Sequence, residues 1–86
     1  MTQRKTIPRL EALDLFDSLG APISEKTLDR YRATGILTDS RNGMWIHLFE
    51  DEIRAVAAAT LKANEEGVPL SERISRIEEL VRTSTQ

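Results

Sequence analysis

The sequence predicts a mainly α-helical domain with one small β-hairpin, and two observations lead to this fold class. Apolar residues recur at helical spacing in four segments of the 86-residue chain, and residues that cap or break helices stand at the segment ends. Between the second and third segments lies an Asn-Gly dipeptide, which is typical of a tight hairpin turn. No linker or internal repeat divides the chain, so a single domain is expected over residues 1–86.

The first helix is expected at about residues 6–19. Thr6 can cap it, Pro8 suits its first turn, and Gly20 supplies a stop. Its apolar face repeats at i, i+3, i+4 and i+7 and consists of Ala12, Leu15, Phe16 and Leu19.

The second helix is expected at about residues 24–34 and has the clearest boundaries in the chain. Ser24 is a favoured N-cap residue, and Ile23 and Leu28 occupy the two positions of a hydrophobic staple. Gly35 can end the helix in the left-handed conformation.

A hairpin is expected at about residues 38–47. Asn42-Gly43 should occupy the two central positions of a type I′ turn, where both φ angles are positive. Trp45 lies in the second strand and is expected to pack in the core or against the neighbouring helix.

Two more helices are expected at about residues 50–66 and 71–82. Three acids open the first of these and complement its dipole, Gly67 ends it, and Ser71 can cap the next. The last helix can either close the core or pair with its counterpart in a homodimer. Their apolar stripes consist of Ile53, Val56, Ala57, Thr60 and Leu61, and of Ile74, Ile77, Leu80 and Val81.

Two helices joined by a short turn and followed by a hairpin form the pattern of a winged helix-turn-helix, in which the second helix enters the DNA major groove. On a helical wheel of residues 25–34, Leu28 and Tyr31 fall together and are expected to face the core. The opposite side consists of Lys26, Arg30 and Ala33, with Asp29 beside them.

Long cations on this helix and on the hairpin are the candidate contacts. Lys26 and Arg30 can reach guanine acceptors or phosphate oxygens, and Arg41 can touch the DNA backbone from the hairpin tip. The full set expected to contact double-stranded DNA is Ser24, Lys26, Thr27, Arg30, Tyr31, Arg32, Arg41, Asn42 and His47.

The sequence resembles the DNA-binding part of the MerR family of transcriptional regulators from Ile23 to Leu80. Asp29 and His47 stand where that family usually has arginine. The resemblance implies a MerR-like winged helix-turn-helix in a short form without effector domain, or a fragment of a longer regulator. The residues that bear it are Ile23-Ser24, Thr27-Leu28-Asp29-Arg30-Tyr31, Gly35-Ile36-Leu37, Arg41-Asn42-Gly43, His47-Leu48-Phe49, Glu50-Asp51-Glu52-Ile53 and Gly67-Val68-Pro69-Leu70-Ser71.

Charge and composition argue against other classes. The net charge is −2, but residues 1–47 hold seven Lys or Arg against six Asp or Glu, so the acidic excess lies in residues 48–86. With one histidine, no cysteine, no Ser-His-Asp set and no Gly-rich phosphate loop, we expect no enzyme, no metal site, no cofactor and no small-molecule ligand. The longest apolar run, residues 55–59, is too short to span a bilayer, which favours a cytoplasmic, nucleoid-associated protein.

Three functions are compatible with this pattern. The first is sequence-specific binding of double-stranded DNA by a MerR-like transcriptional regulator. The second is an excisionase-like or phage-encoded architectural factor of a mobile element, which uses the same DNA chemistry. The third is a protein-protein interaction module on a helix-turn-helix fold, in which Asp29 and the acidic second half contact a basic partner.

Overall fold

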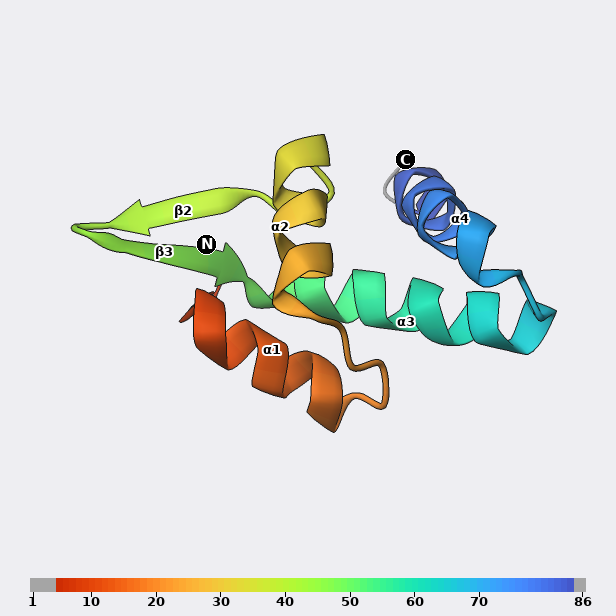
Figure 1. The fold of residues 1–86 in the computed structure, drawn as a ribbon. Coiled ribbons are helices and arrows are strands. Elements are labelled where there is room, and N and C mark those ends of the chain that lie inside the picture. The colour runs from red at the N-terminus through yellow and green to blue at the C-terminus, as the bar shows by residue number, and fades with distance from the viewer. Residues whose placement is uncertain (1–4, 85–86) are drawn as a thin grey trace.

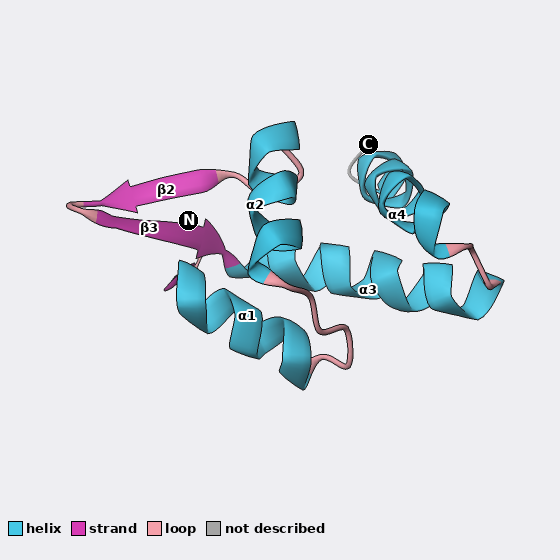
Figure 2. Ribbon diagram, in the orientation of Figure 1, coloured by secondary structure: helices cyan, strands magenta, loops and turns pink. Residues whose placement is uncertain are grey.

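The chain folds into four helices and one small three-stranded antiparallel sheet over residues 5–84, the part that the computed structural model describes (Figures 1 and 2). For three of these residues the structure describes only the backbone: Asn42, Leu70 and Ser84. The expected class, mainly helical with a β-hairpin, is confirmed. The elements are β1 (Thr6–Pro8), α1 (Arg9–Ser18), α2 (Glu25–Thr34), β2 (Asp39–Asn42), β3 (Trp45–Phe49), α3 (Glu50–Glu66) and α4 (Leu70–Ser84).

The beginning of the chain differs from the expectation, because residues 6–8 form strand β1 and the first helix starts at Arg9. β1 pairs antiparallel with β3, Thr6 opposite Phe49 and Pro8 opposite His47, so the sheet order is β1-β3-β2. Thr6 is therefore not a helix cap. Pro8 takes the N-cap position with extended ψ, which suits a residue that has no N–H to donate at a strand end.

The hairpin turn lies one residue later than predicted. Asn42 pairs with Trp45, which leaves Gly43 and Met44 as the two loop residues. Gly43 has φ +68°, and no non-glycine residue in the described range has a positive φ. A glycine with positive φ at the first loop position fits a type II′ turn. The shift places Arg41 opposite Ile46.

The predictions for α2 and α3 are confirmed, and α4 is longer than expected. α2 ends at Gly35 and α3 ends at Gly67, with φ of +85° and +71°. α4 begins at Leu70, so Ser71 lies inside its first turn instead of capping it.

The core lies where α1, α2 and the sheet meet α3, and α4 closes it. Ile77 and Val81 of α4 are buried with the rest, so the apolar stripe of this helix is used within the chain. Leu61 was expected in the stripe of α3 but is exposed, and Ala59 and Ala63 are buried in its neighbourhood. The largest fully buried side chains are Tyr31, Phe16, Leu28, Leu37, Leu48, Ile53 and Val56.

Helix α2 stands between the β2-β3 hairpin on one side and α4 on the other, above the long helix α3 (Figure 1). The hairpin projects away from the helices, and its turn is the part of the sheet most distant from α2. Within residues 5–84, no helix combines the length and the apolar character needed to cross a membrane.

Candidate nucleic-acid interface

The first turn of α2 is fixed by its own cap. Ser24 has extended backbone angles, and its Oγ accepts a hydrogen bond from the backbone N–H of Thr27 at 3.2 Å. The Ser24 hydroxyl donates to Oγ1 of Thr27 at 3.1 Å. Both predicted site residues are therefore engaged at the start of the helix, where they hold the free N–H groups of the first turn in place.

The exposed side of α2 is a ridge formed by Lys26, Asp29, Arg30 and Ala33, called the outer ridge below. All four residues are exposed, whereas Leu28 on the opposite side is fully buried, as the helical wheel predicts. Within the described residues, Lys26 forms no ion pair. The ridge thus presents a free ammonium group at Lys26 and a small alanine about two turns later.

Arg30 leans toward α4. Its Nη2 lies 3.6 Å from a carboxylate oxygen of Glu78, and 54% of its side chain remains exposed. Glu78 itself is almost completely buried and also meets Arg82 at 3.6 Å. Arg30 is therefore held by one long contact to a buried carboxylate, while about half of its side chain stays open to solvent.

A chain of ion pairs runs along the other flank of α2, from α1 to the hairpin, and we call it the α2 ion-pair chain. Both carboxylate oxygens of Asp29 accept hydrogen bonds from Arg9 at 3.0 Å, and Oδ1 also accepts one from Arg32 at 3.0 Å. Arg32 continues to Asp39 of β2, to which its Nε donates at 2.7 Å and its Nη2 at 3.1 Å. The chain joins α1, α2 and β2, and its Arg9–Asp29 pair spans 20 residues of sequence.

These contacts keep both carboxylates of the α2 ion-pair chain ionised. Hydrogen bonds from Arg9 hold the pKa of Asp29 below its usual value, and hydrogen bonds from Arg32 do the same for Asp39. Arg32 was predicted to contact DNA, but its side chain is only 18% exposed and both of its faces are occupied by carboxylates. In this structure it fixes the hairpin to α2 and is not a free cation.

Tyr31, another predicted contact, lies in the core with 1% exposure and cannot also touch a ligand at the surface. Burial, helped by the negative charge of Glu78, raises the pKa of its hydroxyl to about 12. The wheel places Tyr31 with Leu28, and this part of the prediction is confirmed.

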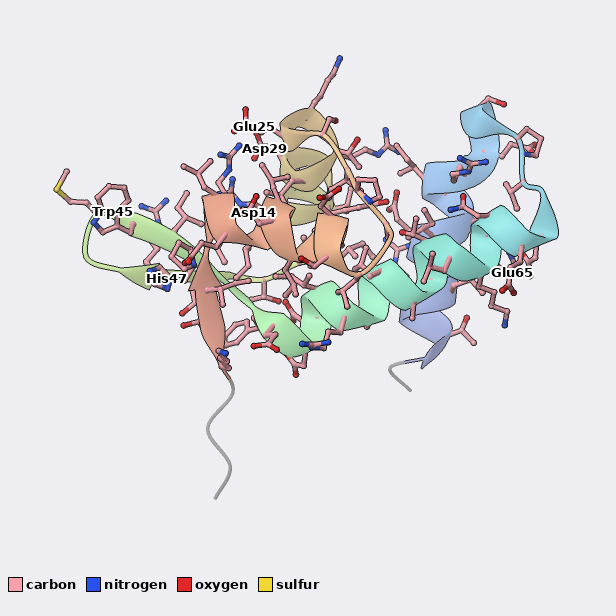
Figure 3. All side chains as sticks on the ribbon, turned by 90° about the horizontal axis from the view of Figure 1, so that it is seen from below. Asp14, Glu25, Asp29, Trp45, His47 and Glu65 are labelled. Carbon is pink, nitrogen blue, oxygen red and sulfur yellow. The ribbon has the colours of Figure 1, made fainter. Side chains whose placement is uncertain are left out.

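The hairpin separates its predicted contacts. Arg41 is exposed near the turn, as expected, whereas His47 lies half-buried in the middle strand between Ser40 and Pro8. The side chain of Asn42 lies outside the described residues. Trp45 was expected to pack inside the fold, but it is 72% exposed at the far end of the hairpin (Figure 3).

Comparisons with family models, with curated proteins and with solved structures find no match for this chain. A functional site can therefore be inferred only from the geometry of this chain.

Among residues 5–84, no group of three His, Asp or Glu side chains could hold a metal ion. A hollow of about 370 Å³ lies between the start of α2 and helices α3 and α4, and Arg73 lines it.

Sequence reasoning missed the role of Arg9. Twenty residues separate it from Asp29, and nothing in the local sequence around either residue indicates the pair. The outer ridge offers two accessible cations and the hairpin a third, Arg41, whereas the carboxylates of Glu25, Asp29 and Asp39 are already paired.

Proposed function

We propose that this chain is a sequence-specific double-stranded DNA-binding protein of the winged helix-turn-helix type, acting as a MerR-like regulator of transcription. In this proposal, α1 and α2 are the helix-turn-helix, α2 enters the major groove, and the β2-β3 hairpin is the wing. The observation that carries the proposal is the exposed outer ridge of α2, a capped helix that stands between the hairpin and α4 (Figure 1).

Each residue of the ridge has a specific task in this arrangement. Arg30 can donate two parallel hydrogen bonds to O6 and N7 of a guanine, once it leaves its 3.6 Å contact with Glu78. Lys26 lies one turn earlier and can reach a second base or a phosphate. Ala33 has a short side chain, so the helix can approach the floor of the groove closely.

Backbone phosphates would be held at two other places. The capped N-terminus of α2 offers N–H groups and the positive end of a helix dipole to one phosphate. Arg41, exposed on the hairpin, would meet a phosphate of the adjacent backbone. These contacts set the register of the protein on the duplex without reading sequence.

The charge of the surface limits the expected affinity. Among the described residues of the outer ridge and the hairpin, only Lys26, Arg30 and Arg41 offer accessible cations, because the α2 ion-pair chain occupies Arg9 and Arg32. At about 0.9 per neutralised phosphate, three contacts give a slope of about −3 in a plot of log affinity against log salt concentration. This chain should thus bind DNA weakly unless a second copy or a second protein contributes.

One observation favours a different function, a protein-protein interaction module. Asp29 of the outer ridge, together with Glu25 and Asp39, outnumbers the two arginines with which these carboxylates pair. A basic protein segment could compete for these carboxylates.

An architectural factor of a mobile element would use the same DNA contacts as a regulator. The contacts proposed for a regulator therefore apply to it without change.

The test is a selection of bound sequences from a randomised duplex pool, followed by titration of the enriched duplex and a scrambled one at two salt concentrations. Arg30→Ala should reduce affinity for the enriched duplex by about 1–3 kcal/mol and bring it close to that for the scrambled one. Arg41→Ala should weaken both duplexes alike and reduce the salt slope by about one.

Arg54→Ala is the matched control for Arg30→Ala. Arg54 lies on α3, is 55% exposed and pairs with Glu50, so it resembles Arg30 in exposure and in having a carboxylate partner, although its contact of 2.9 Å is shorter than the 3.6 Å of Arg30. Its replacement should leave both affinities unchanged. Salt-insensitive binding, no enrichment, or equal losses for Arg30→Ala on both duplexes would refute base reading by α2.

A further inference from the structure

The hairpin turn carries two large apolar side chains that the fold does not use. Met44 is 95% exposed and its neighbour Trp45 is 72% exposed, while most other large apolar side chains of the described range are buried or half-buried. Leaving two such side chains in water side by side brings no benefit to folding. A contiguous apolar patch on a projecting element is typical of a contact site.

The surroundings of this apolar tip suit a polyanion. Residues 40–48 include Arg41 but no Asp or Glu, and Arg41 is exposed. The nearest hairpin carboxylate, Asp39, stands at the root of β2 and is already paired with Arg32 at 2.7 Å. Arg41 pairs with Ile46 and Trp45 pairs with Asn42, so Arg41 and Trp45 stand on opposite faces of the hairpin. No carboxylate among residues 40–48 repels phosphates, so either face of the tip can approach a nucleic acid.

The root of the hairpin fixes where the tip can reach. Arg32 joins β2 directly to α2, so the strand starts at the flank of the outer ridge. Four strand residues at about 3.3 Å each extend about 13 Å, and the turn adds a few more. Half a helical turn of DNA is about 17 Å, which is the distance along one face from a major groove to the next minor groove.

We propose that Met44 and Trp45 form an apolar wedge that enters the minor groove next to the major groove occupied by α2. This inference rests on the proposed function. Apolar side chains inserted from the minor groove unstack a base step and bend the duplex toward the major groove. Pyrimidine–purine steps such as TA and CA/TG deform most easily, so the bound sites should place such a step under the tip.

Trp45 is the only tryptophan of the chain, so its emission reports on the tip alone. The experiment titrates the full chain with a fluorescein-labelled duplex of about 20 base pairs taken from the selection described above. It records the anisotropy of the label and, on an unlabelled copy, the Trp45 emission and its quenching by acrylamide. Stacking on bases should quench the emission and protect it from acrylamide, with the same midpoint as the anisotropy.

Substitutions at the tip test whether the contact matters. Trp45→Ser and Met44→Ser should each lower affinity for the enriched duplex by roughly five- to 100-fold, the range of one lost base stack or wedge. Trp45→Phe should retain most of it. Leu61→Ser is the matched control, because Leu61 is an exposed apolar residue on α3, and it should have no effect. Circular dichroism checks that all variants are folded.

Each outcome decides the inference. Binding with unchanged Trp45 emission and no effect of the tip variants would overturn the wedge and leave DNA binding intact. Absence of any salt-sensitive duplex binding would overturn both. A Trp45 emission change that depends on protein concentration without DNA would assign the tip to contacts with a second copy and overturn the wedge.

Discussion

Replacing Asp29 by asparagine should strengthen DNA binding and steepen its salt dependence. Asp29 lies on the outer ridge, half exposed, and accepts hydrogen bonds from Arg9 and Arg32. Because these bonds lower its pKa, the carboxylate is ionised at neutral pH. It would therefore repel phosphates and also occupy two guanidinium groups. Asparagine has the same shape without the charge.

The structure sets the size of the effect. Asp39 still holds Arg32 at 2.7 Å in the variant, so only Arg9 loses its main partner and keeps a longer contact, 3.5 Å, to Glu25. One freed cation adds about 0.9 to the salt slope. A fourfold rise in salt concentration, from about 50 to about 200 mM, should then cost the variant about 3.5-fold more affinity than the parent chain.

Fluorescence anisotropy with the enriched duplex at several salt concentrations measures both quantities. Glu65→Gln is the control, since it removes one negative charge near the end of α3, well away from Asp29 (Figure 3). It should leave the slope unchanged. An Asp29→Asn variant with unaltered slope and affinity would show that phosphates do not approach the outer ridge, and the reasoning would fail. Weaker binding to the enriched duplex alone would assign Asp29 to a base contact.

Three further predictions concern stability. Ser24→Ala should lower the free energy of unfolding in urea by about 1 kcal/mol, because the N–H of Thr27 loses its acceptor, whereas exposed Ser75→Ala should have almost no effect. Phe16→Ala should cost about 3–5 kcal/mol, since Phe16 is fully buried, and a loss below 1 kcal/mol would contradict the core described above. Tyr31 has a pKa of about 12 in the fold against about 10 in the unfolded chain, so stability from this group is complete below pH 10 and declines by up to about 3 kcal/mol as pH rises to 12. Tyr31→Phe should lack this component of alkaline unfolding, and tyrosinate absorbance of the single tyrosine measures the pKa directly.

Elements with local signals could be predicted from the sequence. The bounds of α2 follow from Ser24 and Gly35, which act on backbone groups within four residues of themselves. The exposed and buried sides of α2 follow from the helical period alone. The bounds of α3 could be predicted in the same way, from the acids at its start and Gly67 at its end, although its apolar stripe was predicted wrongly at Leu61.

Features that depend on distant partners could not be predicted. Strand β1 exists because β3, some forty residues later, offers it a pairing edge. Arg32 appeared free in sequence, but Asp29 and Asp39 enclose it in the fold. Trp45 was placed inside because large aromatic residues prefer burial. A turn shifted by one residue changes the face of every strand residue, and sequence does not fix that shift.

The three-residue strand β1 has a practical consequence for anyone who handles this protein. It occupies the edge of β3 opposite to β2, and the backbone N–H of Glu50 donates to the carbonyl of Lys5 at 2.9 Å. Residues 5–8 thus connect the base of the hairpin with the first turn of α3. Purification tags joined close to Thr6, or deletions that reach Ile7, would change the orientation of the hairpin, although these positions lie far from its tip. The other terminus is therefore the safer place for fusions.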